Sequence, residues 1–213
     1  MSPPTIRGIR IARLHRLKPI LRSWISLNVT FGSYWARDYS DSPWWYNERA
    51  TLSFFAGAVW RAGGWAFEEF STSKQGQSTS GAKSLRTGRC DINFGVNSAE
   101  YVAEAKQSWP ILGHPTRGAK DVVNSLHAAE RDARQLRDMR LPCLGIAFAS
   151  PRIHMRMRHQ LRPLLAEFVN SLSNVQDATV AWTFPTASHN LRPEGRNKQY
   201  IYPGVLVLIR RAA

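Results

Sequence analysis

Apolar and polar residues follow two periods along this chain, and together they predict an α/β protein. A period of two, or a short unbroken apolar run, is typical of a β-strand, whereas apolar residues three and four positions apart are typical of a helix. Strands are expected at residues 65–70, 89–96, 101–107, 144–150, 178–184 and 204–209. Helices are expected at residues 43–62, 116–139 and 161–172.

Residues that begin or end elements set the boundaries. Ser42 is a favourable N-cap and Pro43 suits the first helical position, so the first helix is expected to start there and to end at Gly63–Gly64. Asn97–Ser98 is expected to form the turn of a hairpin between the two central strands. Residues 71–87 are rich in Ser, Gly, Lys and Gln, and we expect them to form a long loop.

The strand at residues 101–107 carries a carboxylate and an ammonium on one face, because Glu104 and Lys106 are two positions apart. Burying either charge is costly unless it is paired or bound to a metal. The preceding strand places Asp91 across the hairpin. Glu48 lies four residues before Leu52, at the top of the apolar stripe of the first helix. Carboxylates that face one side of two neighbouring strands can hold a hard divalent cation such as Mg²⁺.

Each of these acids also has a plainer interpretation. Glu104 and Lys106 could form a structural ion pair at a sheet edge. Glu48 could serve only to favour the dipole of its helix. Glu68 or Glu69 could replace Glu48 as the additional acid.

The chain is strongly basic, with 29 Lys and Arg against 15 Asp and Glu and a net charge of +14. This balance predicts attraction to a polyanion, most often nucleic acid. Residues 1–40 are interpreted either as an arm that lies along phosphates or as a helix face packed on the domain. The residues expected to contact phosphates are Lys120, Arg131, Arg152, Arg156 and Arg158.

Composition also limits the setting in which the protein acts. Cys90 and Cys143 have no metal-ligand spacing, so neither a disulfide framework nor a structural zinc site is expected, and a reducing, cytoplasmic location is favoured. The sequence has no apolar run long enough to predict a membrane span. We expect a basic extension at residues 1–40 and a single domain at residues 41–213.

On its acidic and basic residues the chain resembles the PD-(D/E)XK nuclease superfamily, which has the restriction-endonuclease-like fold. The similarity covers roughly residues 42–150 and rests on Asp91 followed by Glu104-Ala105-Lys106. Glu48 resembles the helix-borne acid of many members, and Gln107 resembles the glutamine that follows the motif in the RecB-like and lambda-exonuclease-like branches. The resemblance implies an αβββαβ core in which helices flank a central mixed sheet.

The resemblance also implies a role for each motif residue. Asp91, Glu104 and the backbone carbonyl of Ala105 would bind Mg²⁺, for which Mn²⁺ would substitute, and Glu48 would complete the site directly or through water. Lys106 would position the attacking water, and Gln107 would belong to the catalytic set. Cys90 stands where the family has its name-giving proline. Because that proline is commonly missing in members, the departure affects recognition more than chemistry.

The sequence therefore predicts a Mg²⁺-dependent nuclease that hydrolyses phosphodiester bonds, with DNA favoured over RNA. One alternative is a nucleic-acid-binding protein that keeps the fold without catalysis. Another is a resolvase that acts as a homodimer on branched DNA. The sequence does not distinguish cutting at ends from internal cutting.

Overall fold

The computed structural model describes residues 6–35, 41–77, 83–114, 118–190 and 199–212, and within them the chain is an α/β protein. The strands of the main sheet are β1 (Ile6–Arg10), β2 (Trp65–Gln77), β3 (Lys83–Val96), β4 (Ala99–Ser108), β5 (Cys143–Ala149), β7 (Thr179–Phe184) and β9 (Val205–Arg211). The four α-helices are α1 (Lys18–Trp35), α2 (Glu48–Arg61), α3 (Gly118–Ala133) and α4 (Leu161–Ser173). A second, two-stranded sheet is made by β6 (Ile153–His154) and β8 (Tyr200–Ile201). Short 3-10 helices are η1 (His15–Leu17), η2 (Pro43–Trp45), η3 (Arg134–Met139), η4 (Met155–Gln160) and η5 (Thr186–Asn190).

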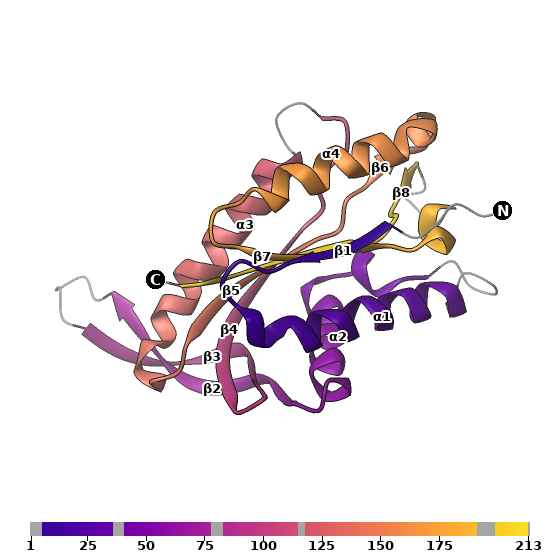
Figure 1. Cartoon of the computed structure of the whole chain (residues 1–213). Coiled ribbons are helices and arrows are strands. Elements are labelled where there is room, and N and C mark those ends of the chain that lie inside the picture. The colour runs from indigo at the N-terminus through magenta and orange to yellow at the C-terminus, as the bar shows by residue number, and fades with distance from the viewer. Residues whose placement is uncertain (1–5, 36–40, 78–82, 115–117, 191–198, 213) are drawn as a thin grey trace.

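The main sheet is mixed and open, with strand order β1-β7-β9-β5-β4-β3-β2. Helices α1 and α2 cover one face, and α3 and α4 cover the other (Figure 1). Strands β4 and β5 are parallel, whereas the other neighbouring strands are antiparallel. A parallel pair needs a long crossover connection, and α3 supplies it between β4 and β5.

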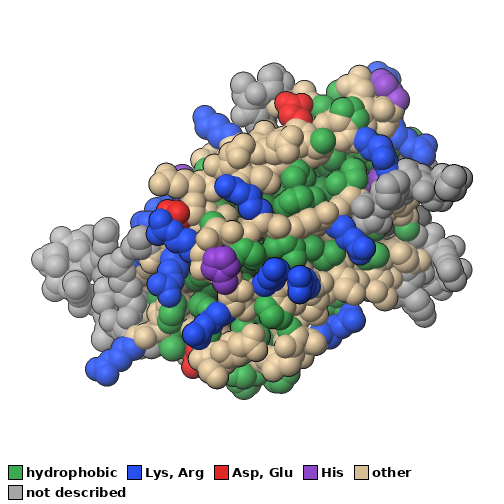
Figure 2. All heavy atoms as spheres, viewed as in Figure 1, with side chains coloured by type: hydrophobic (Ala, Val, Ile, Leu, Met, Phe, Trp, Pro, Cys, Tyr) green, Lys and Arg blue, Asp and Glu red, His purple; other side chains and the backbone are tan. Residues whose placement is uncertain are grey.

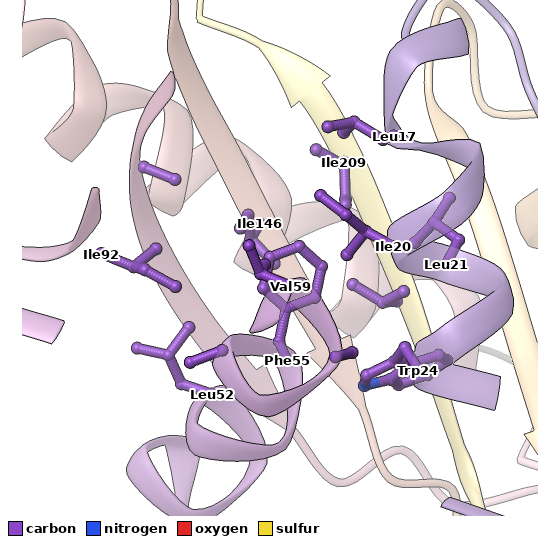
Figure 3. Close-up of a cluster of buried hydrophobic side chains, with 14 of the residues drawn as sticks. Leu17, Ile20, Leu21, Trp24, Leu52, Phe55, Val59, Ile92, Ile146 and Ile209 are labelled. Carbon is purple, nitrogen blue, oxygen red and sulfur yellow. The ribbon is translucent and has the colours of Figure 1, made fainter. Parts of the chain in front are cut away.

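The core beneath α1 and α2 forms where the apolar sides of both helices meet the sheet. Figure 3 shows side chains from the two helices pointing toward one another and onto the strands. The labelled members are Leu17, Ile20, Leu21, Trp24, Leu52, Phe55, Val59, Ile92, Ile146 and Ile209, and all are buried. Burial of a large apolar side chain contributes about 1.5–3 kcal/mol, so this cluster fixes α2 firmly against the centre of the sheet.

Residues 6–35 pack on the domain, which is the second of the two interpretations of the basic N-terminal stretch. β1 pairs with β7 at an edge of the sheet, and α1 contributes to the core. Gly8 makes the pairing possible, because a Cβ there would lie 2.3 Å from the Trp182 ring. The sequence analysis did not predict β1 or α1.

The helix expected at residues 43–62 begins later than the sequence predicts. Pro43 starts the 3-10 helix η2 instead, and α2 begins at Glu48. Its N-cap is Asn47, whose Oδ1 accepts a hydrogen bond from the Ala50 N–H at 2.9 Å. Ser42 makes no capping hydrogen bond. Two competing cap signals lie close together, and the asparagine is the one that begins the α-helix.

The loop expected at residues 71–87 is largely wrong. β2 continues to Gln77 and β3 starts at Lys83, and the two pair in continuous register from Phe70↔Cys90 outward. Residues 78–82 lie outside the described residues. Backbone pairing in this ribbon does not require one apolar face, so the alternation that identifies a strand is missing from its sequence. The long second helix also divides, into α3 and the 3-10 helix η3.

Two further expectations concern the whole chain. The sequence predicts no disulfide framework, and Cys90 and Cys143 are both free and buried. In the part of the chain that the structure describes, no helix has the length and apolar character needed to cross a membrane.

Candidate active site

The site is built where β3 separates from β4. Their pairing ends at Ile92↔Ala103, although β4 continues for five more residues. Just beyond this point Glu69 on β2 has a φ of +54°, which interrupts the regular strand opposite Asp91. The Asp91 carboxylate turns toward the freed edge of β4, where its Oδ2 accepts a hydrogen bond from the Ala105 N–H at 2.7 Å. A carboxylate thus takes the place of a strand partner.

Glu48 reaches the same edge of β4 from the first turn of α2. The backbone N–H of Gln107 hydrogen bonds to it. Burial raises the pKa of Glu48, the nearby negative charge of Asp91 raises it further, and Lys106 and the Gln107 N–H oppose the shift. Glu48, Asp91 and Lys106 therefore lie within electrostatic range of one another.

Glu104 is the deepest acid of the group, with 3% of its surface exposed. It lies on β4 beside Gly145 of β5. Its charge acts on Cys90: burial, then Glu104 and then Asp91 together raise the pKa of that thiol to about 12. Glu104 and Asp91 therefore both lie within electrostatic range of Cys90.

Lys106 makes a contact that the sequence analysis missed. Its Nζ lies 2.9 Å from Oδ2 of Asp132, on the face of the sheet that α3 covers. Burial pulls the pKa of Lys106 down, but Asp132, Glu48 and Asp91 together outweigh burial and leave the pKa raised. The group is thus held as an ammonium ion among carboxylates from three different elements.

A weak sequence signal for Asp132 existed. The residue lies three positions after the buried Ala129 and directly before the buried Ala133, at the border of the apolar stripe of α3. An acid at such a border can face either solvent or the sheet. The sequence alone does not choose between these two directions.

Gln107 occupies a supporting position. Its side chain points to the opposite face from Lys106, where Nε2 donates to the Trp44 carbonyl at 2.8 Å and to Ser150 Oγ at 3.1 Å. The amide thus joins η2 to the end of β5, while the backbone of the same residue binds Glu48. Gln107 fixes the segment that leads into α2.

The alternative acids have other partners. Glu68 accepts a hydrogen bond from Ser53 Oγ at 2.9 Å. Glu69 binds Arg49 through one carboxylate oxygen at 2.9 Å and Arg89 through the other at 2.8 Å. Of the acids considered, Glu48 is the one that meets Lys106 and Asp91.

The residues expected to contact phosphates lie on α3, on η4 and directly before β6. Lys120 is exposed near the start of α3, Arg131 is exposed on the same helix, and Arg156 and Arg158 are exposed on η4. The Arg152 guanidinium lies 4.8 Å from the centre of the Tyr200 ring. Figure 2 shows Lys and Arg spread over one face of the molecule with few acidic side chains among them.

The chain segment that contains β6 and η4 has basic residues and no acidic residue. Between Asp138 and Glu167 the sequence contains no acidic residue. We call the exposed or partly exposed side chains of Arg152, His154, Arg156, Arg158 and His159 the β6–η4 patch. It follows directly after the carboxyl end of β5, the strand that pairs with the site strand β4.

Comparison with known proteins found no matching protein family, no similar curated protein and no similar solved structure. Functional inference for this chain therefore depends on the residues and their geometry.

Proposed function

We propose that this protein is a Mg²⁺-dependent nuclease of the PD-(D/E)XK type that hydrolyses phosphodiester bonds, with DNA as the preferred substrate. One observation carries the proposal. At the freed edge of β4, the acids Glu48 and Asp91 lie within electrostatic range of the Lys106 ammonium, and Glu104 lies on the same strand. Such a mixture of carboxylates and a lysine suits catalysis of phosphoryl chemistry better than it suits stability.

The order of elements supports the restriction-endonuclease-like interpretation of the fold. Helix α2 is followed by three antiparallel strands, β2, β3 and β4, and then by α3 and the parallel strand β5. This is the αβββαβ order expected from the resemblance. Asp91 lies on β3, and Glu104, Ala105 and Lys106 lie on β4.

The donor set fits a hard cation. Glu48, Asp91 and Glu104 supply carboxylate oxygens, and the Ala105 carbonyl points to the same strand edge as its N–H, which already meets Asp91. Among the residues that the structure describes, no three Asp, Glu, His or Cys side chains form a ready metal cluster. Mg²⁺ does not need one, because it is usually bound by one or two carboxylates, several waters and substrate phosphates. When bound, Mg²⁺ would polarise a phosphoryl oxygen and lower the pKa of a water.

The protein's own residues have separable tasks. The Ala105 N–H orients Asp91, and the Gln107 N–H orients Glu48. The Lys106 ammonium supplies positive charge where negative charge develops on a phosphate, and it can orient the attacking water. The β6–η4 patch and the net charge of +14 supply affinity for the phosphate backbone, which falls steeply as salt rises.

Cleavage assays on linear and circular duplex DNA test this proposal. We expect cleavage with Mg²⁺ or Mn²⁺, none with EDTA, and a loss of about 100-fold or more in Asp91→Ala and in Lys106→Ala. Asp121→Asn is the matched control, because it removes one negative charge from α3 outside the site. Cleavage that survives both site substitutions would contradict the assignment.

A nucleic-acid-binding protein without catalysis is the second candidate. It is favoured by the lack of a ready cluster of three metal ligands in the described residues, and by the engagement of Lys106 with Asp132. That candidate predicts salt-sensitive DNA binding that is unaffected by Mg²⁺ and by Asp91→Ala. The nuclease predicts that metal changes both binding and the state of the DNA.

A further inference from the structure

Asp132, the partner of Lys106, lies on a part of α3 that is anchored to β9 and packed closely on β5. Two residues before Asp132, Glu130 forms a buried ion pair with Arg210 of β9, in which Nη2 donates to Oε2 at 2.8 Å and Nε donates to Oε1. A Cβ at Gly145 of β5 would lie 2.8 Å from the Glu130 backbone N. The helix backbone therefore lies directly on β5. Next to Asp132, these contacts fix the distance of α3 from the sheet and its rotation about the helix axis.

The strand that carries Lys106 is aligned with this contact. Glu104 pairs in register with Gly145, and Lys106 pairs with Ala147. The position where α3 touches β5 thus lies beside the site strand, and the backbone that carries Asp132 is held beside the site. Lys106 itself has four rotatable side-chain bonds and no rigid geometry of its own.

We propose that Asp132 is a positioning residue that holds the Lys106 ammonium away from full contact with Glu48 and Asp91, so that it can face the scissile phosphate. Without Asp132, the nearest compensating charges for Lys106 are the two acids expected to bind the cation. The ammonium would then fall onto those acids and compete with the metal. This inference rests on the proposed nuclease function and adds a residue from α3 to its site.

Kinetics provide the first test. Asp132→Asn keeps the shape of the side chain and removes its charge, and we expect the turnover number for Mg²⁺-dependent DNA cleavage to fall about 10- to 100-fold. DNA affinity should change no more than in Asp121→Asn, which makes the same charge change on the same helix. Asp132→Glu, which retains the carboxylate, should recover part of the loss. Equal turnover in wild type and Asp132→Asn, or equal losses in the Asn and Glu variants, would overturn the inference.

A second measurement does not depend on activity. In ¹H–¹⁵N spectra of lysine ammonium groups, a salt-bridged Lys106 should give a protected signal, assigned by its absence in Lys106→Met. That signal should shift or broaden in Asp132→Asn and stay unchanged in Asp121→Asn. An unchanged Lys106 signal in Asp132→Asn shows that Asp132 does not hold the lysine. If wild type gives the protected signal but cleaves no DNA, the nuclease function fails, and the catalytic role of Asp132 fails with it.

Discussion

Two acids that lie two residues apart on α3 each form an ion pair, and the two pairs differ in burial and in the number of hydrogen bonds. Glu130 is buried and Arg210 is partly buried, with side chains 5% and 20% exposed, and they share two hydrogen bonds. Asp132 and Lys106 are 40% and 34% exposed and share one contact. Glu130 raises the pKa of Arg210 above its usual value, although burial opposes this.

The contrast distinguishes Glu130–Arg210, a pair that stabilises the fold, from Asp132–Lys106, a pair that can open. A buried pair that loses one partner leaves an unpaired charge in a low-dielectric interior, so its partners cannot exchange. A half-exposed pair contributes little to stability and can open when another charge arrives. α3 therefore carries Glu130, whose ion pair fixes the helix on the sheet, and Asp132, whose half-exposed ion pair can open.

The largest expected effect comes from breaking the buried pair. Glu130→Gln leaves the partly buried Arg210 without its hydrogen-bonded counter-charge and should lower the free energy of unfolding by about 3 kcal/mol. Asp132→Asn should change the free energy of unfolding by less than about 1 kcal/mol. Urea denaturation of both variants measures the difference. Equal destabilisation by the two substitutions would remove the distinction between the pairs.

A smaller effect is expected from Gly145→Ala, which inserts a methyl group between α3 and β5. The new Cβ would lie 2.7 Å from the Cγ of Glu130 and 2.8 Å from its backbone N, so the helix must move. Overpacking of this kind costs about 1–3 kcal/mol. Because Asp132 moves with the helix, DNA cleavage should fall by more than the loss of folded protein explains. Full activity per folded molecule would show that the site does not depend on this contact.

The smallest expected effect appears at alkaline pH. The folded-state pKa of Lys106 is raised, so the charged form stabilises the fold at every pH below the ordinary lysine value of 10.5, and this contribution disappears as pH rises through the higher folded value. Arg210 remains charged throughout that range. The difference in unfolding free energy between wild type and Lys106→Met should therefore stay constant up to about pH 10.5 and shrink above it. A difference that shrinks below pH 9 would contradict the raised pKa.

Much of the fold was predictable because its apolar patterns are strong. The hairpin through Asn97–Ser98, the buried strand β5 and the helix stripes follow from periodicity, and the structure contains all three. β1 was not predictable from periodicity, because arginines occupy its pattern and its pairing depends on Gly8 fitting against Trp182. Local pattern identifies elements, but the partner of an edge strand depends on contacts far away in the sequence.

For the candidate site, the sequence predicted only part of the grouping of residues that the structure contains. Periodicity assigns Glu48, Asp91 and Lys106 to one helix and two strands. They meet because the β3–β4 pairing ends at Ile92↔Ala103, which frees N–H groups of β4 for the two carboxylates. Asp132 was missed, because α3 is separated from β4 by a connection whose length and path determine which helical residue meets the lysine. The side chain of Gln107 also turned out to join η2 and β5, a contact that depends on the position of the 3-10 helix.

The strand order has a consequence for how the protein is made. β9 lies between β7 and β5, yet the ribosome produces it after every other strand of the sheet. Until residues 205–211 emerge, β1–β7 and β5–β4–β3–β2 are two part-sheets, each with an open apolar edge. Exposed edges of this kind are sites of aggregation. A nascent chain of this protein should therefore require protection by chaperones until residues 205–211 have left the ribosome, and a premature stop before Val205 should yield an insoluble product.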